Sequence, residues 1–395
     1  MWPLVTSAPV ASIGPLVPAD ELLVHQIADT FATVGQSDRS WTEKIWAMAT
    51  DRKGSIQAAF GLGVYPNRGV IDAFGGVSRG VEQWTVRASG RLGKDAGVGN
   101  IGPLRYQVIE PLREVRFSLD ANPAVPISFE WLFEGIIPPT TERREEHRGV
   151  SGRRIAADVV RYHQVGTASG WVEVDGSRTN MTADTWVSAR DHSWGVRYGV
   201  GSPVDDAAPE HDGTGVASVI MWCPVFLETP GGERYAMHWY YQGHSVGSWR
   251  REDLQGGVEM PDGSKRRFTS LRHNLKFEPE NRRFLSGELE FTMEDGTKRP
   301  LTLRAVSDTG FQLGAGLYMG YDEKWHGQWR GDDFLEGEYH ADCATSENAV
   351  RLHQLRDCVI EVKDPVGGGT GWGNLQSIVS GAHPDMGLDA EGSFT

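Results

Sequence analysis

Apolar and polar positions alternate along most of the chain from residue 55 onward, and this period of two predicts strands. In residues 127–137, for example, Phe129, Trp131 and Phe133 fall on one side of the chain, and the intervening residues fall on the other. Turn sequences separate the apolar runs, including Asp-Gly pairs at 175–176, 262–263 and 295–296. Helical spacing is clearest in a short segment, Glu21–Phe31. The pattern therefore predicts an all-β protein built from antiparallel hairpins.

The strands form two successive arrays of about 150 residues each, a length that favours two barrels or sandwiches over one large sheet. We expect an N-terminal arm with a short helix at 1–40, a first barrel at 41–205 and a second barrel at 206–364. The acidic, turn-rich segment 201–213 is the expected boundary between the barrels. Residues 365–395 are rich in glycine, and we expect them to be a tail that packs only partly.

Composition narrows the classes of function. The chain has 395 residues with 39 Lys+Arg against 53 Asp+Glu, a net charge of −14, which argues against binding to nucleic acid or to anionic lipid. No run of about 18 apolar residues occurs, so we expect no membrane span. The 49 glycines support the turns and bulges of a β protein.

Cysteine usage and the N-terminal segment bear on the compartment. Three cysteines, Cys223, Cys343 and Cys358, fit a reducing environment, with a Cys343–Cys358 disulfide as the alternative. The first residues carry no basic start of the kind a signal peptide needs, and four prolines interrupt their apolar stretch. We therefore expect a cytoplasmic protein, and the sequence leaves its oligomeric state open.

The densest group of polar and aromatic residues is Arg190–Tyr198, with the sequence RDHSWGVRY. An Asp–His pair acts as acid and base near neutral pH when burial shifts the pKa values. Simple alternation separates Asp191 from His192, so we expect a bulge or a sharp turn at Gly195 that lets several side chains converge. The structural alternative is a buried ion pair between Asp191 and Arg190 or Arg197, with Trp194 as a plug.

The string RDHSWGVR resembles the Asp-His-x-Trp-Gly signature of the carotenoid 1,2-hydratase superfamily, which includes kievitone hydratase and Diels–Alderase-type cyclases. The segments FGLGVYPNRG and KWHGQWRG give weaker support. The resemblance implies two tandem lipocalin-like β-barrels and a role for His192 and Trp194 in adding water. The resemblance also implies a Tyr and an Asp on a later strand. The matching strand here, SVIMWCPVF, offers Trp222 and no carboxylate, which leaves Asp191 as the nearest proton donor.

These features predict a cofactor-independent acid–base enzyme that acts on an apolar isoprenoid, steroid-like or polyketide compound. The reaction would be hydration, dehydration, isomerisation or cyclisation, because protonating an alkene needs an acid in a dry site and aromatic faces stabilise the cation. In this hypothesis Asp191 donates the proton and His192 orients it or activates water. Trp194 shapes the pocket, and Arg197 holds Asp191 or a substrate oxygen.

Two other interpretations remain open. The first is a non-catalytic lipocalin-type carrier of a hydrophobic ligand. The second is an active site elsewhere, such as the aromatic patch Tyr321–Trp329. We expect neither a metal site nor a nucleotide site, because HExxH and GxGxxG followed by a helix are both missing. The expected substrate-binding residues are Tyr198, Trp222, Glu43, Trp46, Glu130 and Tyr162, with a solvated outer face as the alternative for Glu130.

Overall fold

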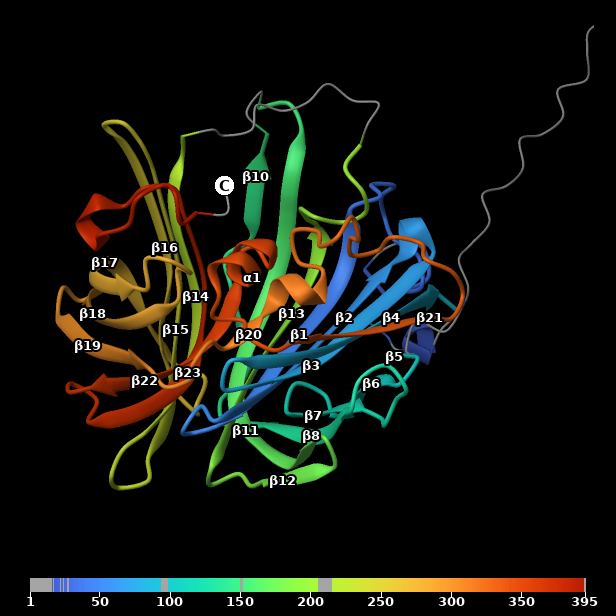
Figure 1. Ribbon diagram of the computed structural model, residues 1–395, viewed down its shortest axis with the longest axis horizontal. Helices are drawn as coiled ribbons and strands as arrows, with labels where there is room; N and C mark the ends of the chain where they lie inside the picture. The colour runs from blue at the N-terminus through green and yellow to red at the C-terminus, as the bar shows by residue number, and fades with distance from the viewer. Residues whose placement is uncertain are drawn as a thin grey trace, which may run out of the picture.

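The computed structural model describes residues 16, 18–21, 23, 25–26, 28–93, 99–149, 152–204 and 215–393. The described chain is almost entirely β structure in two antiparallel sheets, which confirms the predicted all-β class of tandem lipocalin-like barrels. Figure 1 shows the sheets side by side, with β14 and β23 of the second facing β11 and β13 of the first.

The first sheet is long and curled. Its strand order is β21-β4-β3-β2-β1-β13-β11-β8-β7-β6-β5, and β9, β10 and β12 also pair with β11. The curl brings β5 and β6 close to β3. The strands are β1 (Trp41–Asp51), β2 (Ile56–Tyr65), β3 (Val70–Arg79), β4 (Glu82–Arg91), β5 (Asn100–Ile101), β6 (Leu104–Glu110), β7 (Glu114–Leu119), β8 (Ile127–Gly135), β9 (Thr140–Thr141), β10 (Glu145–Arg148), β11 (Ile155–Val174), β12 (Ser177–Met181), β13 (Trp186–Val196) and β21 (Phe334–His340).

The second sheet closes on itself. Its order is β19-β18-β17-β16-β15-β14-β23-β22-β20, and pairing of β19 with β22 completes the barrel. Its strands are β14 (Ala217–Glu228), β15 (Arg234–Val246), β16 (Trp249–Glu259), β17 (Lys265–Phe277), β18 (Phe284–Met293), β19 (Lys298–Ala305), β20 (Phe311–Gln312), β22 (Arg356–Asp364) and β23 (Gly369–Ser380). The helical turns are η1 (Pro18–Glu21), η2 (Pro66–Arg68), η3 (Leu313–Gly316), α1 (Ser346–Arg351) and η4 (Pro384–Met386).

The expected segments differ from the structure at both ends. Residues 365–395 are not a tail that packs only partly, because β23 lies between β14 and β22. Its glycines permit close strand packing: a Cβ on Gly371 or Gly373 would meet a β14 carbonyl oxygen at 2.5 or 2.4 Å. At the other end, the described part of 21–31 contains no α-helix, and residues 22, 24 and 27 lie outside the described residues.

The division between the barrels is also less simple than expected. Strand β21 falls within the segment 206–364 that we assigned to the second barrel, yet it pairs with β4 at the edge of the first sheet. The chain therefore crosses back between the sheets. Most of the expected boundary at 201–213 lies outside the described residues.

Three apolar clusters hold the fold together. One fills the curl of the first sheet around Phe117 and Trp131, and another fills the closed barrel around Trp239. A third lies between the sheets and contains Trp46 and Trp222, two of the predicted substrate-binding residues. None of the described helices has the length and apolar character needed to traverse a bilayer.

Candidate active site between the two sheets

Strands β1, β13 and β11 are neighbours, and their register decides which side chains meet. Asp191 is opposite Trp46 on β1 and His163 on β11, and this row faces the second sheet. His192 is opposite Tyr162 on β11, in a row that faces the interior of the first sheet. Both ladders continue through residue 195 without a shift, so the expected bulge at Gly195 is absent. Asp191 and His192 therefore lie on opposite faces of the sheet.

Gly195 has a different role from the one expected. Its φ of +132° lies in a region that L side chains rarely adopt, and a Cβ there would meet the carbonyl oxygen of Asp158 at 2.0 Å. Glycine thus allows β13 to approach β11 closely, and alternation continues on either side of it. The side chains of the sequence signature consequently divide between two groups instead of converging.

A cavity of about 410 Å³ lies between the sheets. Five predicted site residues line it: Trp46, Asp191, Arg197, Tyr198 and Trp222. Tyr198 is exposed, whereas the two tryptophans are buried and meet edge to face with ring centroids 5.3 Å apart. The wall also contains residues outside the set of site residues expected from the sequence, namely Lys44, Glu145, His147, Arg161, Ser193, Ile220, Tyr240, Gln242, His244, Tyr318, Met319, Leu355, Gln376 and Ile378.

Asp191 on β13 lines this cavity beside Arg161 of β11. Its Oδ2 lies 3.3 Å from Nε of Arg161, and its side chain is 16% exposed. Burial raises the pKa of Asp191 above its usual value, although the charges of Arg161 and Arg197 act in the opposite direction. The expected ion pair with Arg190 or Arg197 is wrong, because the guanidinium within ion-pair distance belongs to Arg161 and Arg190 faces the other side of the sheet.

A chain of charges continues behind the cavity wall. Arg161 Nη1 lies 3.2 Å from Glu142 Oε2, and Glu142 Oε1 accepts a hydrogen bond from Trp222 Nε1 at 2.8 Å. His163 Nδ1 lies 3.0 Å from Glu142, and its Nε2 lies 3.1 Å from Glu259. Burial lowers the pKa of His163, but the two carboxylates outweigh it and bring the pKa to about 9. This protonated histidine therefore joins the sheets electrostatically.

Glu142, His163 and His238 offer ligand atoms that all lie within 4.8 Å of one another. The two imidazole rings, however, stack with centroids 3.7 Å apart and planes at 26°. A bound metal lies in the plane of each imidazole that it bonds, and nearly parallel stacked rings direct their nitrogen lone pairs side by side instead of toward one point. Glu142 Oε1 is also occupied by Trp222 Nε1. The group fits a buried ion-pair network better than a metal centre.

A second polar group, the lumen group, comprises Glu43, Tyr162, His192 and Trp194 inside the first sheet. His192 Nε2 lies 2.6 Å from Glu43 Oε1, and its Nδ1 lies 3.1 Å from the Tyr162 hydroxyl. The Trp194 ring meets His192 edge to face at 5.6 Å. None of the four lines the cavity between the sheets. The expected cooperation of His192 and Trp194 with Asp191 is therefore not available in this geometry.

Glu130 belongs to neither group. Its side chain is exposed on β8, while the flanking Phe129 and Trp131 point into the first core. The alternative of a solvated outer face is correct for this residue, and the expected role in substrate binding is not supported. The Tyr321–Trp329 patch is also separate from the cavity, although the nearby Tyr318 lines it.

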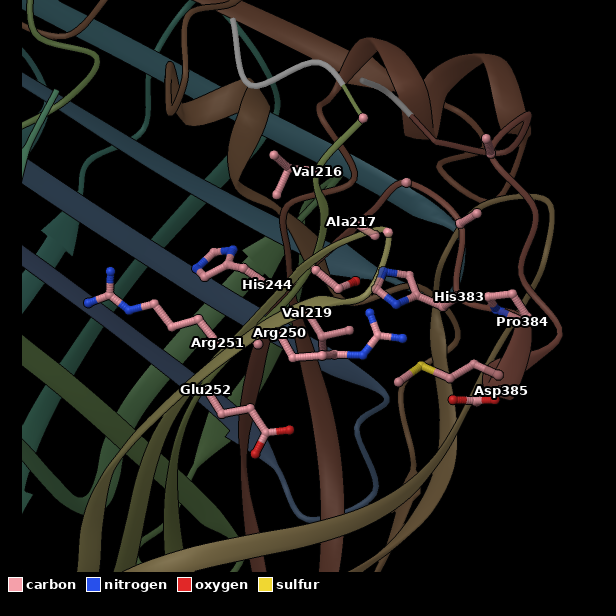
Figure 2. Close-up of a pocket in the computed structure, with 18 of the residues that line it drawn as sticks. Val216, Ala217, Val219, His244, Arg250, Arg251, Glu252, His383, Pro384 and Asp385 are labelled. Carbon is pink, nitrogen blue, oxygen red and sulfur yellow. The ribbon is translucent and has the colours of Figure 1, made fainter. Parts of the chain in front are cut away.

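A larger hollow of about 880 Å³ lies at one end of the closed barrel (Figure 2). Its floor includes Val219 and Tyr241, which belong to the barrel core. Figure 2 shows Arg250, from β16, and His383, just before η4, among the residues that line it. His244 lines both this hollow and the cavity between the sheets, so the two adjoin at that residue.

Some of the missed residues carry a sequence signal. Lys44 and Arg161 lie two positions before Trp46 and His163 respectively, and a period of two places each pair on one face. Tyr318 follows η3, and only the return of the chain to the first sheet brings it to the cavity.

Comparisons with solved structures find similar chains at low identity. A protein from Nitrosomonas europaea is 12% identical, with a TM-score of 0.48 over 85% of this chain and 92% of that chain. Kievitone hydratase from Nectria haematococca is 10% identical, with a TM-score of 0.41 over 85% and 89%. CghA, in a structure with Sch210972, is 11% identical, with a TM-score of 0.43 over 86% of this chain and 89% of that chain.

These structures include the hydratase named by the sequence resemblance. A comparison with curated proteins finds no match. Residues 16–389 match the family described as "Family of unknown function (DUF8625)", and the chain is a member of that family.

Proposed function

We propose that this protein is a cofactor-independent acid–base enzyme whose active site is the cavity between the sheets. Its reaction is a hydration, dehydration, isomerisation or cyclisation of an apolar isoprenoid, steroid-like or polyketide compound. The observation that carries the proposal is the placement of Asp191, a buried carboxyl group with a raised pKa, on the wall of a cavity lined by aromatic side chains.

The environment of Asp191 suits the transfer of a proton to carbon. Trp46, Trp222 and Leu355 are buried on the cavity wall and limit the access of water to a bound substrate. The aromatic faces stabilise positive charge by about 0.5–2 kcal/mol per ring. A carboxyl group whose pKa is raised by burial can hold a proton and donate it in such a site.

In the proposed reaction, the π electrons of a substrate double bond take the proton of Asp191 and leave a carbocation against the tryptophan rings. Water then adds to the cation and releases a proton, or a neighbouring C–H loses its proton to form a new double bond. The Arg161 guanidinium, 3.3 Å from Asp191, stabilises the carboxylate until it regains a proton. Protons and electrons balance without a redox partner.

The carrier hypothesis has one observation in its favour. The hollow of about 880 Å³ at the end of the closed barrel is larger than the proposed active site and has an apolar floor. A carrier needs a cavity but does not need an acid. The two hypotheses therefore differ in what they demand of Asp191.

The proposal also places the protein in the cytoplasm. All three cysteines are free and buried, so the Cys343–Cys358 disulfide is absent. Three unpaired thiols support a reducing compartment.

Incorporation of solvent deuterium into a small-molecule substrate tests the proposal, and it does not require that the physiological compound is known. Compounds that co-purify with the protein, together with a panel of trisubstituted alkenes and unsaturated ketones, are incubated in ²H₂O and analysed by mass spectrometry. We expect carbon-bound deuterium or the mass of water to appear with the native chain. The Asp191→Asn variant should bind the same compound but react about 100-fold more slowly or worse.

Two results would contradict the proposal. Reaction of Asp191→Asn at the native rate would place the acid elsewhere. Tight binding of a co-purified compound without any exchange by the native chain would support the carrier.

A further inference from the structure

Two cations on the cavity wall have no carboxylate partner among the residues that the structure describes. Lys44 is buried, with 3% of its surface exposed, and its Nζ lies 4.1 Å from the centroid of the Tyr318 ring. Among the described residues, no carboxylate oxygen lies within 4.0 Å of this ammonium group. Most buried lysines are paired, so an unpaired one at a cavity calls for an explanation.

Arg197 is the second cation. Its Nη2 donates a hydrogen bond to Ser193 Oγ at 2.6 Å, while its Nε is buried without a hydrogen-bond partner in the described chain. No carboxylate of the described residues lies within 4.0 Å of its guanidinium. Arg161, on the same wall, contrasts with it, because Arg161 lies within ion-pair distance of Glu142, Glu145 and Asp191.

Lys44 and Arg197 also repel each other electrostatically. The charge of Arg197 acts to lower the pKa of Lys44, after the larger effect of burial. Two like charges held together in a desolvated site have a high free energy unless an anion joins them. Asp72 and Asp191 act on Lys44 through their charge, but among the described residues no carboxylate lies within 4.0 Å of either cation, and the cavity has room for an anion from outside.

We propose that the substrate of this cavity carries a carboxylate, which binds to Lys44 and Arg197 while its apolar body packs against Trp46, Trp222 and Leu355. The inference rests on the proposed function and deepens it by naming a substrate class, apolar carboxylic acids. A guanidinium fork matches the two oxygens of a carboxylate, and the ammonium adds a further charged hydrogen bond.

The register also sets where the reaction takes place on such a substrate. Lys44 is opposite Ser193, and Trp46 is opposite Asp191, two residues further along β1. Two residues span about 7 Å along a strand. A carboxylate held at Lys44 therefore places the protonated position a few bonds away, next to Asp191.

Binding of a carboxylate also couples to protonation. Burial and the Arg197 charge lower the pKa of Lys44 to about 7, and a bound anion raises it again. Affinity should thus fall as pH rises above 7. Several charged or titratable groups face Lys44: Asp72 from β3, Arg161 from β11, Asp191 from β13, and Arg197, Tyr318 and His326 from the loops.

Calorimetric binding of matched ligand pairs tests the proposal. The probes are 1-naphthaleneacetate, 4-phenylbutyrate and decanoate, each compared with its own carboxamide at pH 6.5. We expect at least one carboxylate to bind about 10-fold more tightly than its amide, or better. Lys44→Met and Arg197→Met should each remove this preference and leave affinity for the amide within about twofold.

Controls separate binding from folding. Lys53→Met removes an exposed lysine on the β1–β2 turn and should leave the preference intact. Lys44→Arg keeps the positive charge and should retain part of the preference for the carboxylate over its amide. If Lys44→Met fails to fold, the decline in native-chain affinity between pH 6.5 and 8.5 provides the same test.

Equal binding of acids and amides, or no binding by any probe, would overturn the proposal. Tighter binding of 1-naphthyl phosphate than of any carboxylate would overturn the assignment of the anion as a carboxylate. These outcomes are independent of the exchange experiment: carboxylate binding without exchange by Asp191 would refute only the proposed catalysis.

Discussion

The two faces of strand β13 carry adjacent residues of one sequence signature but form different kinds of site. On the inner face, His192 has a partner on each ring nitrogen, Glu43 on one and Tyr162 on the other. On the face toward the second sheet, Arg197 has a buried nitrogen without a partner in the described chain, and no described carboxylate pairs with the nearby Lys44. The inner group is satisfied by the fold, whereas the interface group is not.

This difference teaches where to look for chemistry. Buried polar groups cost free energy unless they are paired, so a fully paired group stabilises the fold, and an unpaired one in a cavity is a candidate for binding. Lys44 and Arg197, which line the cavity beside Asp191, meet the second criterion. The lumen group meets the first, even though His192 and Trp194 carry the sequence resemblance.

The largest expected effect comes from substitutions on the two faces, measured in parallel. Asp191→Asn should slow the exchange reaction about 100-fold or more, because it removes the acid. His192→Asn, on the other face, should leave the rate within about threefold once the folded fraction is matched by circular dichroism. Equal losses in both variants would show that the faces act together.

The second largest effect should be a loss of stability when the ion-pair network behind the cavity loses Arg161. Arg161→Met leaves Glu142 and Asp191 buried without their shared guanidinium and should cost about 3 kcal/mol in the free energy of unfolding. Arg105→Met is the matched control, because its pair with Asp120 is exposed, and it should cost less than about 1 kcal/mol. Urea denaturation measures both, and similar costs would contradict the distinction.

Lys44 should give a smaller effect with a definite pH dependence. Its pKa is about 7 in the folded chain, against the ordinary 10.5, so between these values the unfolded chain binds more protons. The free energy of unfolding of the native chain should therefore rise, relative to Lys44→Met, by about 1 kcal/mol per pH unit from pH 7.5 to 9.5. Parallel stability curves for the two proteins would show that Lys44 is not desolvated.

Glu130 should give the smallest effect. Its side chain is exposed on the outer face of β8, and Glu130→Ala should change the free energy of unfolding by less than about 0.5 kcal/mol and leave exchange unchanged. Thermal unfolding and the exchange assay together measure this. A loss of ligand binding in this variant would show that Glu130 contributes to substrate binding.

Much of the fold follows from local pattern. The alternation around Phe129 and the Asp-Gly turns predict strands and hairpins that the structure contains, because side-chain period and turn geometry are properties of short segments. The prediction of a tail at 365–395 that packs only partly is wrong. Glycine signals both loose chain and close strand packing, and only the position of β14 distinguishes the two.

The sequence by itself determined the all-β class, since side-chain alternation depends on neighbouring residues. Alternation also separates Asp191 from His192, and the structure keeps them apart, because the bulge at Gly195 that we expected to bring them together is absent. The sequence also indicated Asp191 and Arg197 as members of one candidate site. Only the tertiary structure decided that Arg161 is the partner of Asp191 and that Tyr318 and Trp222 close the cavity. These contacts join segments more than 25 residues apart, and the pairing of strands and packing of two sheets that create them leave no local trace in the chain.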